Sequence, residues 1–212
     1  MTEVDATRGS AIHPAVAKII GGKRGIIDGG LPPIVFVATN ALSGLATDRS
    51  TSLTVAASAA VGVAAVLVLI RLVRRESLKQ AAQGLAGLAI AVGFAVWSGE
   101  ARDFFLPGMY VDAVYGIAFA ASVLVGWPLV GVIYGLLFQT GSSWRHDRRL
   151  RRIFTVATLA WSAVYALRTG VQLAFYGADR PELLAVGKLL LGWPLTVMVV
   201  GLTLAAVRRA ER

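Results

Sequence analysis

The chain has 212 residues, of which 56% are hydrophobic and 16% are charged, and its mean hydropathy is +0.68. This composition excludes an ordinary soluble domain and indicates an integral membrane protein. The sequence contains no cysteine, which excludes disulfides and thiolate chemistry. The net charge of +9 lies mostly in short loops between apolar segments, where it is typical of topology signals rather than of nucleic-acid binding.

Residues 1–25 form a polar segment that has neither a continuous apolar stretch nor a small-residue cleavage site, so we expect no removable signal peptide. We interpret them as a cytoplasmic N-terminal segment, with one or two turns at 14–20 on the membrane surface. The first predicted span is 26–45. Pro32 and Pro33 are expected in its opening turns, where missing amide donors cost least.

The second predicted span, 52–70, is dense in alanine, serine and glycine. Small residues let helices approach closely in lipid, so this segment is expected to be a central packing helix. A basic loop follows and leads to the third predicted span, 81–97.

The segment 107–138 is apolar for 32 residues, which is too long for one membrane crossing. Gly126, Trp127 and Pro128 interrupt it. We therefore predict a fourth span at 107–125 and a short helix at 129–138 that lies in the membrane interface or re-enters it. Gly131 and Gly135 of this short helix fit a GxxxG pattern. Such a pattern either pairs two helices or lets the helix pack closely against the rest of the bundle.

The fifth predicted span, 153–176, carries one full charge, Arg168, inside an otherwise apolar helix. Trp161, Tyr165, Arg168 and Gln172 follow at i, i+4, i+7 and i+11 and therefore share one face. We predict that this face lies against protein and that the opposite face lies against lipid. The sixth predicted span is 183–207. It repeats the tetrapeptide GWPL, and a kink is expected near Pro194.

Together these segments predict an all-α transmembrane bundle of six spans, arranged as three helical hairpins. A single membrane domain covers 26–207, and 208–212 form a basic cytoplasmic tail. Of 21 basic residues, sixteen fall in the two terminal segments and in the loops 71–79 and 145–152, whereas three fall in the opposite loops. The positive-inside rule then places both termini in the cytoplasm of a multi-pass protein of the cytoplasmic membrane.

Polar residues of several predicted spans lie at a similar depth, about 8 to 12 Å from the extracytoplasmic ends. These residues are Asn40, Asp112, Arg168 and Lys188, and together with Gln172 they form a candidate cluster. One interpretation is structural, with Asp112 paired to Arg168 and Lys188 reaching the interface. A second is a positive pocket for an anion such as a lipid phosphate or a small carboxylate. A third is a conducting pathway, but no predicted span has the repeated polar lining that a pore needs.

The cytoplasmic arginines have two compatible interpretations, which are topology and contact with anionic lipid headgroups. The candidate lipid contacts are Arg71, Arg74, Arg75, Arg145, Arg148, Arg149, Arg151 and Arg152. We expect no cofactor, no metal and no nucleic acid, because the two histidines are far apart and no folded nucleic-acid module is recognisable. Protein partners and self-association stay open.

No GxSxG, HExxH or P-loop motif occurs in the sequence. This favours a non-enzymatic, envelope-associated membrane protein. The alternative is a small transporter or lipid-anion-binding protein that uses Asp112, Arg168 and Lys188.

Several segments are family-specific, namely GGKRGIIDGGLP, RLVRRESL, DFFLPG, GWPLVG and WRHDRRLRR. With these motifs the chain resembles an actinobacterial family of integral membrane proteins known as domain of unknown function 3159, over nearly all of residues 20–207. The resemblance implies a membrane fold but no particular chemistry.

Residues 78–207 also resemble, more distantly, the bacterial intracellular septation protein A family. The similarity is carried by Asp103-Phe104, Gly126-x-Pro128-Leu129, Trp144, Trp161, Lys188 and Gly192. Gln172 and Asp112 depart from that family, where an asparagine and an aromatic residue are expected. The resemblance implies a role in envelope maintenance or septation without catalytic activity.

Overall fold

The computed structural model describes residues 22–74 and 78–211, and this part of the chain is helical apart from short connections and contains no strand. The predicted all-α fold is therefore confirmed for the described residues. The predicted surface turns at 14–20 and the candidate lipid contact Arg75 lie outside them. The chain divides into two compact units, 1–101 and 102–212, which we describe separately.

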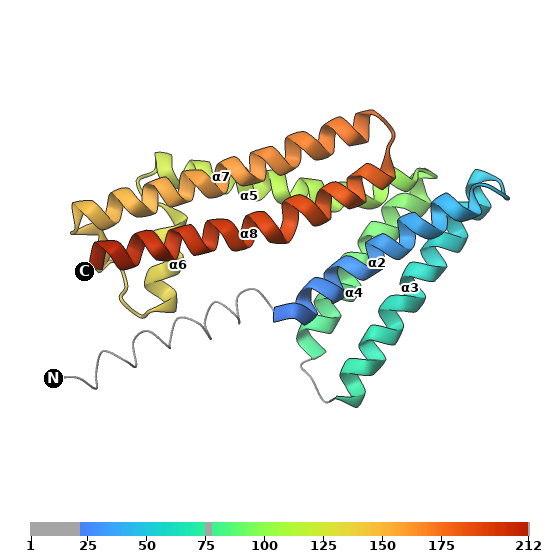
Figure 1. The fold of residues 1–212 in the computed structure, drawn as a ribbon, viewed down its shortest axis with the longest axis horizontal. Helices are drawn as coiled ribbons and strands as arrows, with labels where there is room; N and C mark the ends of the chain where they lie inside the picture. The colour runs from blue at the N-terminus through green and yellow to red at the C-terminus, as the bar shows by residue number, and fades with distance from the viewer. Residues whose placement is uncertain (1–21, 75–77, 212) are drawn as a thin grey trace. The chain divides into compact units, whose positions relative to one another are not determined.

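The first unit contains the helices α2 (Gly22–Ser43), α3 (Arg49–Val73) and α4 (Leu78–Ser98). In Figure 1 these are the blue to green helices. Helix α3 packs against both α2 and α4, and four of its small side chains are buried, at Ala56, Ala57, Ala60 and Ala64. The prediction of a small-residue packing helix is thus confirmed within this unit.

The prediction for the start of the first span is wrong. Helix α2 begins at Gly22, so Pro32 and Pro33 lie in its interior rather than in its opening turns. Each proline removes one backbone hydrogen bond and crowds the preceding turn.

Asp48 begins α3 as its N-cap. Its carboxylate accepts the Thr51 amide at 3.1 Å and the Thr51 hydroxyl at 2.7 Å, and the Ser50 hydroxyl also donates to it. These hydrogen bonds hold the pKa of the Asp48 carboxyl group well below its usual range. The bond from Ser50 has the largest effect, followed by those from Thr51. The next residue, Arg49, forms an ion pair with Glu100 after the end of α4.

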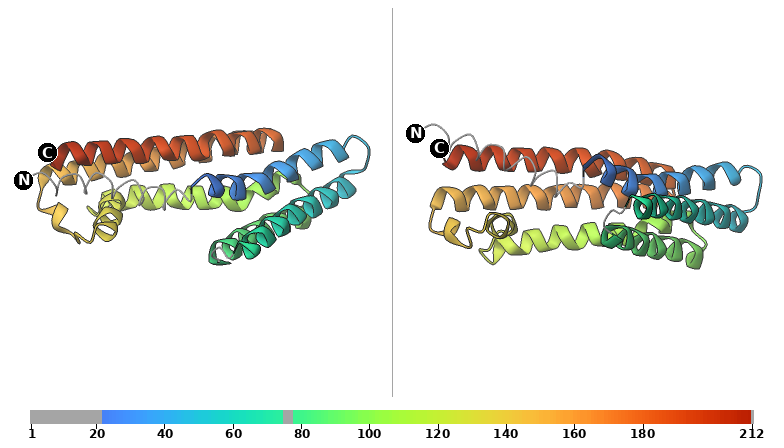
Figure 2. Two further views of the ribbon diagram at one scale, coloured as in Figure 1. Left: turned by 60° about the horizontal axis from the view of Figure 1, so that its bottom comes forward. Right: turned by 90° about the horizontal axis from the view of Figure 1, so that it is seen from below.

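The second unit contains four helices and two 3-10 turns. Its elements are η1 (Ala101–Phe105), α5 (Leu106–Leu124), α6 (Leu129–Leu137), η2 (Ser143–Arg145), α7 (Arg148–Gly177) and α8 (Pro181–Glu211). Helix α7 is the centre of this unit because it contacts α5, α6 and α8. Figure 2 shows the three long helices side by side and, in its right view, the short α6 seen end-on.

The predicted break after the fourth span is confirmed, since α5 ends at Leu124 and α6 starts at Leu129. Gly126 has a φ of 77°, which favours glycine. The amide of Trp127 donates to the Ser122 carbonyl at 2.8 Å and the amide of Gly126 donates to the Val123 carbonyl at 3.0 Å. This is a Schellman motif, which satisfies the last carbonyls of α5.

Hydroxyl groups from two neighbouring helices then cap α6. The Leu129 amide donates to Ser122 Oγ at 3.2 Å, and the Val130 amide donates to Thr158 Oγ1 at 3.2 Å. These bonds satisfy amides that a helix start leaves without partners. They attach the start of α6 to the end of α5 and to α7.

Three helical segments in the described part of the chain are long and apolar enough to cross a membrane. These are Arg49–Val73, Ala101–Leu124 and Pro181–Val207, whereas the apolar stretches Leu31–Ser43 and Ala82–Ser98 are shorter. Large apolar side chains on the three segments are exposed, for example Leu69, Ile117 and Leu202. Apolar surface of this extent suits contact with lipid rather than with water, so the helices are those of a membrane protein.

Candidate functional site

The site begins where α5 and α7 approach closely at Gly116. A Cβ atom on Gly116 would lie 3.2 Å from the Tyr165 Cβ, and the Ser162 hydroxyl donates to the Gly116 carbonyl at 2.9 Å. A side chain at this position would make an unusually tight contact, so glycine favours this close spacing. The close contact fixes which face of α7 points at α5.

Aromatic rings extend this contact along the two helices. Phe119 of α5 packs against both Trp161 and Tyr165 of α7, with ring centroids at 6.0 and 5.7 Å. Tyr115 adds a third contact to Tyr165 at 5.6 Å. The prediction that the Trp161, Tyr165, Arg168 and Gln172 face lies against protein is confirmed, because each of these side chains contacts α5 or α8.

Arg168 is buried and binds α8. Its Nε donates to the Leu191 carbonyl at 2.7 Å. One terminal nitrogen donates to the Gly192 carbonyl at 2.6 Å and to Thr196 Oγ1 at 2.7 Å. The charge is thus held by two backbone carbonyls and one hydroxyl.

Pro194 lies close to the carbonyls of α8 that Arg168 contacts. It lies inside the helix and has no amide hydrogen, so the Leu190 carbonyl has no intrahelical donor. The Leu191 and Gly192 carbonyls, which Arg168 contacts, are the next two along the helix. Neighbouring side chains can satisfy such carbonyls in a membrane helix, and carbonyl dipoles stabilise a cation.

Asp112 has a different partner, since its carboxylate accepts a hydrogen bond from Gln172 Nε2 at 3.0 Å. The expected ion pair between Asp112 and Arg168 is therefore wrong, because in the described residues the two charges are satisfied by different helices. Arg168 and Gln172 are one helical turn apart, yet the longer side chain reaches α8 and the shorter one reaches α5. The depth of the residues alone did not distinguish these two neighbours.

Lys188 of α8 lies against the start of α5. Its Nζ is 3.2 Å from the position that a Cβ atom on Gly108 would occupy, and 5.8 Å from the ring centroid of Phe105. Gly108 and Asp112 are one helical turn apart and share a face of α5. The ammonium group is thus placed about one turn from the Asp112 carboxylate.

Asn40, the fifth member of the predicted cluster, belongs to the first unit. Its carbonyl and its side-chain oxygen accept from Ser52 Oγ at 2.8 and 3.2 Å, and Ser43 and Ser52 hydroxyls lie 2.9 Å apart. These bonds connect α2 to α3. The structure therefore brings together Asp112, Arg168, Gln172 and Lys188, and it gives Asn40 a separate role.

A second polar network, which the sequence reasoning missed, connects η1 to the end of α7. The Tyr176 hydroxyl donates to the buried Asp103 carboxylate at 2.6 Å. The Arg102 guanidinium lies 4.9 Å from the centroid of the Tyr176 ring and 3.7 Å from the Asp179 carboxylate. The adjacent charges Arg102-Asp103 and Asp179-Arg180 in the two loops were the available signal.

The basic residues before α7 and in its first turns are partly engaged in the fold. The Arg145 guanidinium lies 3.8 Å from the Trp127 ring centroid, and Arg149 donates to the Arg209 carbonyl at 3.1 Å. Arg148, Arg151 and Arg152 are exposed at the start of α7. Among the other candidate lipid contacts, Arg71 and Arg74 lie at the end of α3 in the first unit.

Comparison with known proteins identifies the family but no activity. No curated protein and no solved structure matches the chain. The similarity to septation protein A therefore stays a prediction. The sequence model of one family, described as a protein of unknown function (DUF3159), matches residues 20–212. This confirms the resemblance carried by the sequence motifs, and the chain belongs to the DUF3159 family.

Proposed function

We propose that this protein is a six-span protein of the cytoplasmic membrane with both termini in the cytoplasm. Besides the three segments that are long and apolar enough, α2, α4 and α7 have 22, 21 and 30 residues. Each corresponds to roughly 30 Å or more of helix, which is the thickness of the hydrocarbon layer. The distribution of basic residues across the loops supports the orientation.

The topology predicts which positions react with a membrane-impermeant thiol reagent. Single cysteines at positions 48, 102 and 180 are expected to be labelled from outside intact cells. Cysteines at 75, 148 and 209 are expected to react only after the membrane is opened. Because the protein has no cysteine of its own, the unchanged chain is the control. Labelling of position 148 from outside would contradict the six-span arrangement.

We propose further that the protein is non-enzymatic and acts as a structural or interaction protein of the cell envelope, in its maintenance or in septation. The supporting observation is that the polar groups between α5, α7 and α8 are used to join helices. Arg168 makes three hydrogen bonds to α8, and Asp112 accepts one from Gln172. Groups engaged in this way hold a bundle in one arrangement.

The second candidate is a small transporter or lipid-anion-binding protein. It is favoured by Lys188, whose ammonium group lies on the Gly108 and Asp112 face of α5 and whose residue is exposed. A cation beside a carboxylate in the outer half of a membrane could bind and release an anion.

Flux through proteoliposomes distinguishes the two candidates. For the structural role, we expect chloride, phosphate and acetate to cross at the rate of protein-free vesicles, and Asp112→Asn and Lys188→Met to leave that rate unchanged. Asp112→Asn should also keep the Gln172 hydrogen bond, since the asparagine oxygen still accepts. Anion flux that the unchanged protein supports and Lys188→Met abolishes would favour the transporter instead.

A further inference from the structure

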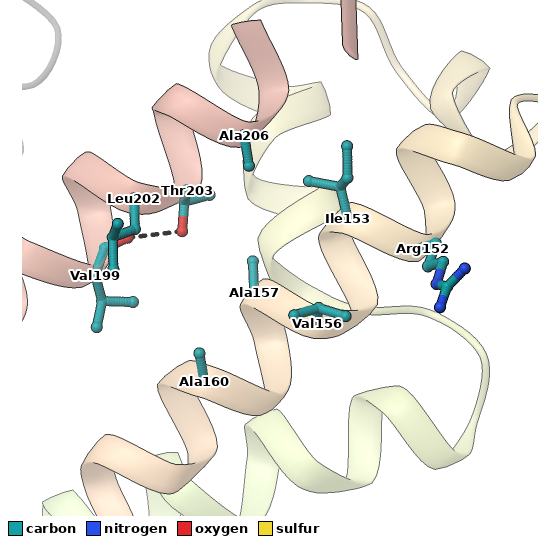
Figure 3. Close-up of a pocket in the computed structure, with 9 residues that line it drawn as sticks. All are labelled: Arg152, Ile153, Val156, Ala157, Ala160, Val199, Leu202, Thr203 and Ala206. Atoms are coloured by element: carbon teal, nitrogen blue, oxygen red, sulfur yellow. Dashed lines mark hydrogen bonds between the residues drawn. The ribbon is translucent and has the colours of Figure 1, made fainter. Parts of the chain in front are cut away.

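A groove runs between α7 and α8 near the arginine-rich start of α7. Its volume is about 400 Å³, which is within the range of about 300 to 1,000 Å³ for ligand pockets. Figure 3 shows its lining, which comes from both helices: Arg152, Ile153, Val156, Ala157, Ala160, Val199, Leu202, Thr203 and Ala206. Except for Arg152 and Thr203, these side chains are apolar.

Small residues create the groove, and larger ones form its rims. Ala157 and Val199 are buried at its floor, whereas Val156 and Leu202 are 60% and 64% exposed. The Thr203 hydroxyl already donates to the Val199 carbonyl at 2.8 Å. A molecule in the groove therefore does not need to accept a hydrogen bond from it. The interior therefore suits a hydrocarbon chain and offers nothing to a hydrated ion.

Positive charge is concentrated at one end of the groove. Arg152 lies there, and within the described part of the chain its guanidinium takes part in no hydrogen bond or ion pair. Arg148 and Arg151 are exposed on the same first turns of α7. A guanidinium can hold two oxygens of a phosphate at once, so an apolar channel ends at a group that binds phosphate.

We propose that this groove binds an anionic phospholipid, with one acyl chain between α7 and α8 and the headgroup phosphate at Arg152. The combination of an apolar interior and a basic end matches the two parts of such a lipid. A helix of a partner or of a second copy would not need a cation at this position, and a free phosphate would not use the apolar interior. The proposal rests on the proposed topology, in which α7 and α8 both span the membrane.

Native mass spectrometry of the full chain in a neutral detergent tests the site. The probe is an equimolar mixture of phosphatidylglycerol and phosphatidylcholine with identical acyl chains. We expect one retained lipid, with phosphatidylglycerol preferred. Ala206→Leu fills the groove and should lower the retention of both lipids about tenfold, as expected for an overfilled apolar site. Ala205→Leu adds the same volume at an exposed neighbouring position that does not line the groove, and it should change nothing.

The charge is tested separately. Arg152→Gln should lower the preference for phosphatidylglycerol about fivefold, as expected for one basic residue near an anionic group, and should leave phosphatidylcholine retention unchanged. Arg151→Gln removes the same charge from an exposed residue outside the lining and is the matched control. Equal losses in these two variants would overturn the site in favour of general electrostatic attraction.

Two further outcomes would also overturn it. One is unchanged lipid retention in Ala206→Leu and in Ala160→Leu, a second filling variant at an exposed position that keeps the proposal testable if the first does not fold. The other is loss of a dimer rather than of a lipid in the same spectra, which would identify the groove as a contact between copies. Thiol labelling as predicted, together with unchanged lipid retention, would overturn the lipid site while leaving the topology intact.

Discussion

Arg168→Gln is expected to lower the Tm of the detergent-solubilised protein by about 6 °C. The substitution removes a charged donor that makes three hydrogen bonds to α8. Hydrogen bonds from charged groups contribute about 1.5 to 3 kcal/mol each, but the removal of a desolvated charge offsets part of this. A net loss of about 2 kcal/mol corresponds to the expected shift for a chain of this length. Arg168→Lys should recover only part of the loss, since an ammonium group cannot reproduce the planar geometry.

Pro194 provides a specific test of this account. Pro194→Ala supplies an amide to the Leu190 carbonyl, next to the Leu191 and Gly192 carbonyls that Arg168 contacts. We expect the more regular turn to make these two carbonyls poorer acceptors for Arg168. In this background Arg168→Gln should cost about 1 kcal/mol less, which a double-mutant cycle of thermal or denaturant unfolding measures. Arg180→Gln, at an exposed position in the same unit, is the control for loss of one positive charge. Strict additivity would show that Arg168 acts independently of the proline.

Gly135→Ala is the second substitution with a large expected effect, and we expect it to destabilise the protein by about 2 to 3 kcal/mol. A Cβ atom at this position would lie 2.1 Å from the Gly141 carbonyl oxygen. The obstacle is backbone, and Gly141 has a φ of 60°, so the loop has few alternative conformations. Overpacking of this kind costs about 1 to 3 kcal/mol. Denaturant unfolding followed by tryptophan fluorescence measures it, because Trp144 is buried against the neighbouring Gly131.

Gly170→Ala is the matched control and should act in the opposite direction. Gly170 lies inside α7, and a Cβ atom there would meet nothing within 4 Å. Alanine is favoured over glycine in a helix by about 0.5 to 1 kcal/mol. A small stabilisation is therefore expected. If both substitutions destabilise equally, the contact between α6 and the η2 loop is not what makes Gly135 necessary.

The two copies of GWPL show what could be predicted from the sequence. At 126–129 an apolar segment too long for one crossing predicted the break, and Gly126 indeed has a φ of 77° and ends α5. At 192–195 the same four residues lie inside α8. The two copies have different tertiary contacts. Hydroxyls of Ser122 and Thr158 cap a new helix after the first copy, whereas Arg168 binds the Gly192 carbonyl of the second.

The polar cluster was predictable only in part. Periodicity placed Arg168 and Gln172 on one face of α7, and the counted depth placed Asp112 and Lys188 at a similar level. The partners did not follow, because the argument assumed that a buried charge seeks the opposite charge. Backbone carbonyls near a proline are acceptors that no count of charged residues includes. The groove between α7 and α8 also could not be predicted from the sequence, since it depends on which alanines of the two helices face each other.

The contact between Arg168 and the Pro194 turn has a consequence for biogenesis. In the proposed topology α7 enters the bilayer with a charge that costs about 2.5 to 3.5 kcal/mol near the centre of a membrane helix, and α8 enters with a carbonyl that lacks its donor. The contact with the Leu191 and Gly192 carbonyls of α8 lowers the cost of burying Arg168, so we expect the hairpin of both helices to be a better substrate for insertion than α7 alone. A nascent chain that stops before α8 leaves Arg168 without acceptors. In the proposed topology, we therefore expect stable retention of α7 in the bilayer to require the synthesis of α8.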